Sequence, residues 1–154
     1  MGKIDDKLEK LGIVVPQPAV PVANYVGFVR TGNLVFTAGQ VTLKDGKFEH
    51  LGKVGGAISL EDAQQAARLC AINIIAQLKV ACDGDLDRVK RIVKLVGFVN
   101  AVPEFTDHPK VINGASDLMV EVFGDAGKHA RSAVGSGSLP LNVAVEVEAI
   151  AEVA

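Results

Sequence analysis

Residues 129–151, HARSAVGSGSLPLNVAVEVEAIA, place Arg131 and Glu146 inside two otherwise apolar strand patterns. The Gly-Ser run 135–138 and the Leu-Pro pair after it predict an irregular turn, because glycine admits positive φ and proline donates no ladder hydrogen bond. In the second strand Glu146 and Glu148 share a face, about 7 Å apart. These charges fit either a solvated sheet face or a binding site made from a guanidinium and a carboxylate.

The composition narrows the class of protein. A length of 154 residues with 49% hydrophobic content predicts one domain with a large core. A net charge of -2 with dispersed basic residues disfavours a nucleic-acid partner. Cys70 and Cys82 fit a helical pattern as buried apolar side chains, not as a disulfide or a metal pair. Without a secretory signal or a membrane-spanning run, we expect a cytoplasmic protein that does not bind membranes.

Periodicity and turn residues predict the element order strand, strand, helix, strand, helix, strand, strand, which is an α+β sandwich with two long helices on one face of a mixed sheet. An amphipathic helix over 1–11, ended by Gly12, and a proline-rich arm over 13–24 precede it, so we divide the chain into 1–21 and a main domain, 22–154. The other predicted elements are a hairpin of 25–30 and 34–38, a mobile loop over 42–57, a helix from the Ser59 cap to Ala81 stopped by Gly84, a strand over 89–102, and a helix from the Asp107 cap to Gly124.

Three features of these elements bear on function. The strand over 89–102 is apolar on both faces, so we expect helices on one side and another subunit on the other, with Gly97 as a bulge or a close-approach point. Asn113 fits an exposed polar position on its helix. His108 and His129 lack the further His or Cys of a zinc site, and we therefore expect no metal.

Several short motifs together resemble one known family. They are Tyr25, the run Thr37-Ala38-Gly39-Gln40, Asn113, the run Ala130-Arg131-Ser132, and Leu139-Pro140 followed by residues 145–151. This set resembles the Rid (YjgF-like) family of reactive intermediate deaminases, which also carries the name endoribonuclease L-PSP. The resemblance covers residues 22–151. It implies a chorismate-mutase-like fold, a homotrimer with ligand clefts between subunits, and cofactor-free hydrolysis of 2-imino acids or their enamine tautomers to 2-oxo acids and ammonia.

The resemblance also implies roles for individual residues. Arg131 matches the arginine that grips the substrate carboxylate, and Glu146 matches the glutamate that orients the attacking water. The other implied substrate contacts are Tyr25, Ala38, Gly39, Asn113 and Ala133, of which Gly39 and Ala133 act through backbone groups. Ala38 stands where deaminase-type members usually have Ser, and Ala133 where Cys is common. With the N-terminal arm and the Gly-rich segments, these departures suggest a divergent subgroup.

Three functions remain open from the sequence. The first is deamination of 2-aminoacrylate-like intermediates by a homotrimer. The second is a non-catalytic regulatory trimer that binds small carboxylates and has lost turnover through the Ala38 change. The third is a ribonuclease, which the acidic charge balance and the absence of a basic, aromatic groove disfavour.

Overall fold

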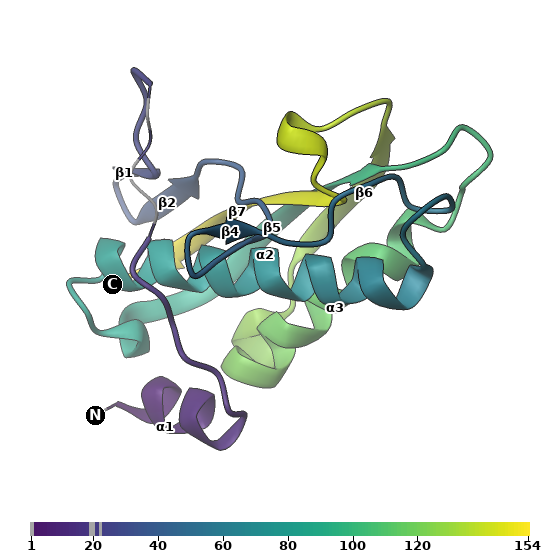
Figure 1. Cartoon of the computed structure of the whole chain (residues 1–154). Helices are drawn as coiled ribbons and strands as arrows, with labels where there is room; N and C mark the ends of the chain where they lie inside the picture. Colours follow the sequence, from purple (N-terminus) through teal and green to yellow (C-terminus); the bar gives the residue numbers. More distant parts are fainter. Residues whose placement is uncertain (1, 19–20, 22) are drawn as a thin grey trace.

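The computed structural model describes residues 2–18, 21 and 23–154 of the chain. Figure 1 shows the long helices α2 and α3 beside the sheet, with α1 and the N-terminus at the lower left of the view. The elements in chain order are α1 (Lys3–Lys10), β1 (Phe28–Thr31), β2 (Leu34–Thr37), β3 (Leu43–Lys44), β4 (Lys47–Phe48), α2 (Leu60–Ala81), the 3₁₀ turn η1 (Leu86–Arg88), β5 (Val89–Asn100), α3 (His108–Phe123), η2 (Gly124–Gly127), β6 (Ala130–Ser136), η3 (Pro140–Asn142) and β7 (Val145–Val153).

Five strands form the main sheet in the order β1-β2-β7-β5-β6, while β3 and β4 form a separate hairpin. Strands β5 and β6 are parallel, and the other neighbouring pairs in the main sheet are antiparallel. The parallel pair is joined through α3, which supplies the crossover that such a pair needs. A mixed sheet with two long helices on one face is the α+β architecture predicted from the sequence.

The two long helices form at the predicted positions. Ser59 Oγ accepts a hydrogen bond from the backbone N–H of Asp62 and so caps α2. Asp107 precedes α3, but its side chain makes no capping bond. This part of the prediction is wrong because Asp107 has ψ 34°, outside the extended region that turns an N-cap side chain back onto the helix. The predicted apolar stripe of α3 is buried throughout, at Val111, Ile112, Ala115, Leu118, Met119, Val122 and Phe123.

Two glycines let the layers approach closely. A Cβ on Gly97 of β5 would collide with the side chain of Ile112 on α3, and a Cβ on Gly114 of α3 would collide with the carbonyl oxygen of Gln64 on α2. Gly97 is therefore a close-approach point. The irregularities in the pairing of β5 with β7 lie nearer its start, between Val89 and Lys94, and not at Gly97.

Three predicted boundaries differ from the structure. β1 begins at Phe28 and leaves Tyr25 outside the sheet, because the chain before it pairs with no strand and packs over α2 at Gly27. β5 ends at Asn100, two residues early. β6 runs through Ser136, so two residues predicted in the turn are paired with β5. Parallel pairing of β6 with a long neighbour extended its ladder into the Gly-Ser run.

The segment 42–57 is not a simple loop. It contains the hairpin β3–β4, and both Thr42 and Val54 are fully buried. Val54 also forms a parallel bridge with Ala101, which follows β5. The apolar side chain of Val54 thus ties this polar segment to the core.

The N-terminal amphipathic helix is confirmed as α1, except that Met1 lies outside the described residues. Its first backbone N–H groups, from Lys3 and Ile4, donate to the Asp87 carboxylate at 3.0 and 2.9 Å. Leu8 is buried against the core. These contacts dock α1 on the domain.

The proline-rich arm has no regular secondary structure at its described positions, and residues 19, 20 and 22 lie outside the described part of the chain. Among the described residues, no helix combines the length and the apolar character needed to cross a bilayer.

Candidate functional site

Arg131 and Glu146 are separated by a strand. Arg131 on β6 pairs with Leu95 of β5, and Glu146 on β7 pairs with Phe98 of the same strand. Two strand spacings and three residues along β5 place their Cα atoms about 14 Å apart. The two side chains also line different cavities. The charged pair singled out by the sequence is therefore not brought together within one chain.

The Arg131 guanidinium is held by α3. Its Nη1 donates to Asn113 Oδ1 at 2.8 Å and to Ser116 Oγ at 3.1 Å. Within the described residues, Nε and Nη2 form no hydrogen bond and the guanidinium forms no ion pair. The free edge of the fork can therefore bind a carboxylate through two parallel bonds. The interpretation of Asn113 as an exposed polar residue is wrong, because it orients Arg131.

Ser116 links Arg131 to His129. His129 Nδ1 lies 2.6 Å from the carbonyl oxygen of Gly127, and its Nε2 lies 2.9 Å from Ser116 Oγ. Because a carbonyl can only accept, Nδ1 carries the proton, and in the neutral ring Nε2 accepts from the Ser116 hydroxyl. That hydroxyl oxygen in turn accepts from Arg131. A cavity of about 270 Å³ is lined by Ser116, His129 and Arg131 together with Val120 and Lys128.

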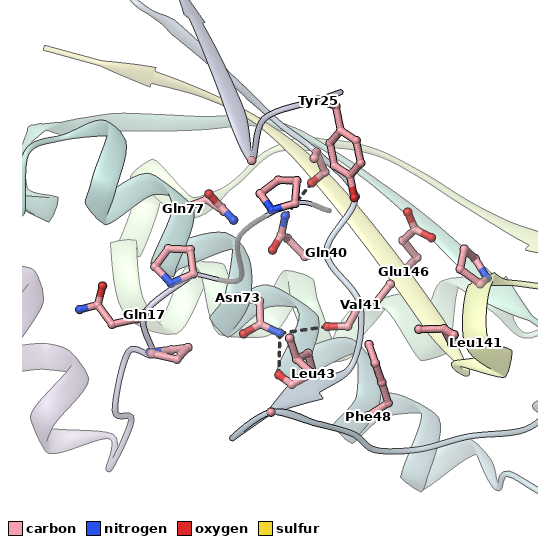
Figure 2. A pocket seen from close by; sticks show the side chains of 18 of the residues that line it. Gln17, Tyr25, Gln40, Val41, Leu43, Phe48, Asn73, Gln77, Leu141 and Glu146 are labelled. Carbon is pink, nitrogen blue, oxygen red and sulfur yellow. Dashed lines mark hydrogen bonds between the residues drawn. The ribbon is translucent and has the colours of Figure 1, made fainter. Parts of the chain in front are cut away.

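Glu146 lies in the wall of a larger cavity, of about 760 Å³. Its carboxylate rests against the backbone of Gly39, where any Cβ would collide with Oε2. Burial raises the pKa of Glu146, and the nearby charge of Glu148 raises it further. Figure 2 shows Glu146 and Leu141 on one side of this cavity, with Tyr25 above and Gln77 on the opposite side. Glu146 is thus a partly desolvated carboxylate facing open space.

Three of the other predicted site residues lie with Glu146, whereas Ala133 lies on β6 near Arg131. Tyr25, Ala38 and Gly39 line the large cavity with Glu146. Ala133 follows Arg131 on β6, opposite Gly97 of β5, and lines neither cavity. The site predicted from the sequence thus consists of a carboxylate half with Glu146 and a guanidinium half with Arg131.

Sequence reasoning missed Ser116, which links His129 to Arg131. It also missed Asn73 and Gln77, two carboxamide residues of α2 that line the large cavity. The available signal was the spacing of Asn73 and Gln77, four residues apart beside the apolar stripe of α2. Within the described residues, no three His, Cys, Asp or Glu side chains gather as a metal site would require.

Comparisons with known proteins agree with this fold. The family model described as "YjgF/chorismate_mutase-like, putative endoribonuclease" matches residues 5–153. A Trypanosoma cruzi protein, TCP17, is 45% identical over 98% of this chain and 94% of its own length. A solved structure of the Agrobacterium tumefaciens protein Atu1372, whose function is unknown, is 47% identical, with a TM-score of 0.93 over 98% of this chain and 92% of that one.

A more distant relative has a named activity. The 2-iminobutanoate/2-iminopropanoate deaminase of Dermatophagoides farinae is 30% identical over 90% of this chain and 92% of its own length. The family match and these relatives all span nearly the whole chain. The chain therefore belongs to the YjgF/chorismate mutase-like family.

Proposed function

We propose that this protein hydrolyses 2-imino acids, or their enamine tautomers, to 2-oxo acids and ammonia without an organic cofactor or metal. The observation that carries the proposal is the half-buried Glu146 carboxylate, with its raised pKa, in the wall of the larger of the two cavities described above. A carboxylate whose pKa is raised is a better base toward water than an ordinary glutamate. The mite relative, named as a deaminase of small 2-imino acids, supports the same chemistry.

The catalytic site forms between two copies of the chain in a homotrimer. Arg131 and Glu146 lie opposite Leu95 and Phe98, three residues apart on β5, so their side chains lie on opposite faces of the sheet with Cα atoms about 14 Å apart. A small imino acid therefore cannot touch both within one chain. The sheet face that the helices leave open carries exposed apolar side chains, among them Val29, Phe36 and Val134. Their burial against a neighbour would favour assembly and would bring the Arg131 half of one copy to the Glu146 half of the next.

Arg131 binds the substrate carboxylate. Nη1 stays bonded to Asn113 and Ser116, and Nε and Nη2 donate to the two carboxylate oxygens. This pairing fixes the imine carbon relative to Glu146 and lowers the entropic cost of reaching the transition state.

Glu146 positions and activates the water. The protonated imine R–C(=NH₂⁺)–COO⁻ is electrophilic at C2. As water attacks this carbon, the Glu146 carboxylate takes a proton from it, and a carbinolamine forms. The carboxyl then returns the proton to the amine nitrogen, the C–N bond breaks as the hydroxyl oxygen forms the carbonyl, and the departing ammonia takes the hydroxyl proton. The balance is R–C(=NH₂⁺)–COO⁻ + H₂O → R–CO–COO⁻ + NH₄⁺.

A second candidate is a trimer that binds small carboxylates without turnover. Ala38 favours it, because this residue lines the Glu146 cavity with a methyl group and supplies no hydroxyl there. We give less weight to RNA cleavage, since no Lys, Arg or His is among the described residues that line that cavity.

The test generates 2-iminopropanoate from alanine with an amino-acid oxidase and traps the remaining imine with semicarbazide. We expect the wild type to deplete the imine before trapping and Arg131→Ala to lose this activity. Lys128→Ala is the matched control, because Lys128 lines the same small cavity and pairs with Asp125. Binding of pyruvate without imine depletion would support the second candidate.

The shared site has its own test. Arg131→Ala and Glu146→Gln are each expected to be inactive. Coexpressed in equal amounts, they should recover about one quarter of wild-type activity, because one site in four then pairs an intact Arg131 with an intact Glu146. No recovery in mixed oligomers would place both residues in one subunit's site and contradict the arrangement between copies.

A further inference from the structure

The cavity beside Glu146 is much larger than the proposed reaction needs. Its volume of about 760 Å³ falls in the range that holds a drug-sized ligand, whereas 2-iminopropanoate has a one-carbon side chain. The cavity extends from Glu146 on β7 to Asn73 and Gln77 on α2, and Figure 2 shows Glu146 and Gln77 on opposite sides of it. The structure therefore contains room for a longer substrate side chain.

The spacing of residues along one face of α2 gives the length of this space. Cys70, Asn73 and Gln77 are three and four residues apart and so share a face of the helix. Cys70 lies at the Glu146 end, since its thiol donates to the carbonyl oxygen of Val145 at 3.5 Å. Gln77 lies two turns farther on, about 10 Å along the axis. A group that touches Glu146 and Gln77 together must be extended.

Gln77 is the buried polar group at that far end. Its residue is 4% exposed, and its amide forms no hydrogen bond to another described residue. The chain at Gly27 packs directly over the amide, so a side chain at position 27 would collide with it. A carboxamide in the wall of a cavity offers N–H donors and a carbonyl acceptor, and it can recognise a neutral polar group there.

Of the neighbouring carboxamides, Asn73 keeps only its Oδ1 acceptor free, because both of its N–H groups are used, whereas Gln40 uses one of its two N–H groups. Both bonds from Asn73 Nδ2 go to the carbonyl oxygens of Val41 and Leu43, and Gln40 Nε2 donates to Ala38. The charged residues among those that line the cavity are Asp45 and Glu146, both acidic. A second carboxylate on the substrate would find no cation there, whereas a donor such as an amide N–H would find carbonyl oxygens.

We propose that the cavity along α2 is a side-chain subsite for 2-imino acids with an extended, uncharged side chain ending in a hydrogen-bonding group, of which a terminal carboxamide is the best match to Gln77. This inference rests on the proposed deaminase function, because it assumes that the imine carbon sits beside Glu146. The glutamine-derived imine is a substrate of this class. The glutamate-derived imine has nearly the same shape but carries a second negative charge.

The test compares imines that amino-acid oxidases form from glutamine, glutamate and alanine, measured as kcat/KM in the trapping assay. We expect kcat/KM for the glutamine-derived imine to exceed the other two by about tenfold or more. Gln77→Leu should lower kcat/KM for the glutamine-derived imine about tenfold and so remove that preference. Gln65→Leu, an exposed position on the same helix, is the control. Equal values for all three imines in the wild type, or a preference that survives Gln77→Leu, would overturn the subsite.

A binding measurement separates failure of the subsite from failure of the chemistry. If no imine is hydrolysed, the deaminase proposal fails, and calorimetric titration with stable 2-oxo acids then decides the subsite. Tighter binding of the 5-methyl ester of 2-oxoglutarate, which is uncharged at that end and carries a carbonyl acceptor, than of pyruvate and 2-oxoglutarate, weakened by Gln77→Leu, supports it. Equal affinities, or no effect of Gln77→Leu, overturn it.

Discussion

Gly39 lies against the Glu146 carboxylate so closely that any side chain at position 39 would collide with Oε2. Gly39 follows β2, and Glu146 is the second residue of β7. The contact therefore joins two elements that are far apart in sequence. The backbone of Gly39 is not in the left-handed region, and its small size is therefore required by the carboxylate alone.

Gly39→Ala should displace the Glu146 carboxylate and lower kcat by roughly 10- to 100-fold, because small displacements of a catalytic group have large effects on rate. The variant should keep nearly the wild-type thermal midpoint. Steady-state kinetics and thermal unfolding check the two halves of this prediction. Gly137→Ala is the control, since a Cβ there meets nothing within 4 Å. Full activity in Gly39→Ala would show that Glu146 has no fixed position in the reaction.

The acid limb of the pH–rate profile should lie above the ordinary glutamate value of 4.5, because Glu146 must be ionised to accept a proton and its pKa is raised. The charge of Glu148 is the second cause of that shift. Glu148→Gln should therefore move the acid limb to lower pH. Glu152→Gln, exposed farther along β7, should leave it in place. If the acid limb stays at the same pH in Glu148→Gln, Glu146 is not the titrating group.

Glu146→Gln should make the folded protein more stable at neutral pH. Because the pKa of Glu146 is higher in the folded chain, that chain still holds a proton at pH values where the unfolded chain has released it. Wild-type stability therefore falls as the pH rises from 4.5 through the folded pKa. The variant has no such titration, so its advantage should grow across this window. Urea unfolding at several pH values measures it, and a constant difference would contradict the raised pKa.

Ser116→Ala should weaken substrate binding more than turnover. The Ser116 hydroxyl accepts from Arg131 and donates to His129, so its loss frees the guanidinium to adopt other positions. A lost hydrogen bond to a charged group predicts a rise in KM of about tenfold, with kcat nearly unchanged. Ser116→Thr keeps the hydroxyl and should restore KM. If Ser116→Ala and the wild type have equal kinetics, Asn113 alone suffices to position Arg131.

Gly114→Ala should destabilise the fold although alanine is the better helix former. The new Cβ would collide with the carbonyl oxygen of Gln64, a backbone atom that cannot rotate away. Forcing α2 and α3 apart should cost about 2 kcal/mol, more than the helix propensity returns. Denaturant unfolding measures the change, with Gly137→Ala again as control. A stabilised variant would mean that the two helices separate easily.

Much of the fold could be predicted because local patterns agree with it. The Ser59 cap, the apolar stripe of α3 and the β-branched residues of β5 each favour the structure that forms. The errors lie at ends of elements, where tertiary pairing decides. Gly135 and Ser136 are residues typical of turns, yet they pair with β5 in a parallel ladder.

The candidate site was less accessible to sequence reasoning. The short motifs identified the family and named Arg131 and Glu146, since both stand out as charges among apolar strand residues. The periodicity of α2 showed its buried stripe but not that Gln77 faces a cavity. Burial of a polar side chain depends on what packs over it, and here Gly27, fifty residues earlier, does so.

The sequence by itself determined the long helices, the strands of the main sheet, their order and the family, because these depend on patterns within short stretches of chain. The tertiary structure alone decided that β5 separates Arg131 from Glu146, that Gly39 touches the Glu146 carboxylate, and that His129 reaches Arg131 through Ser116. These relationships depend on strand order and on contacts between residues distant in sequence, which no local pattern encodes.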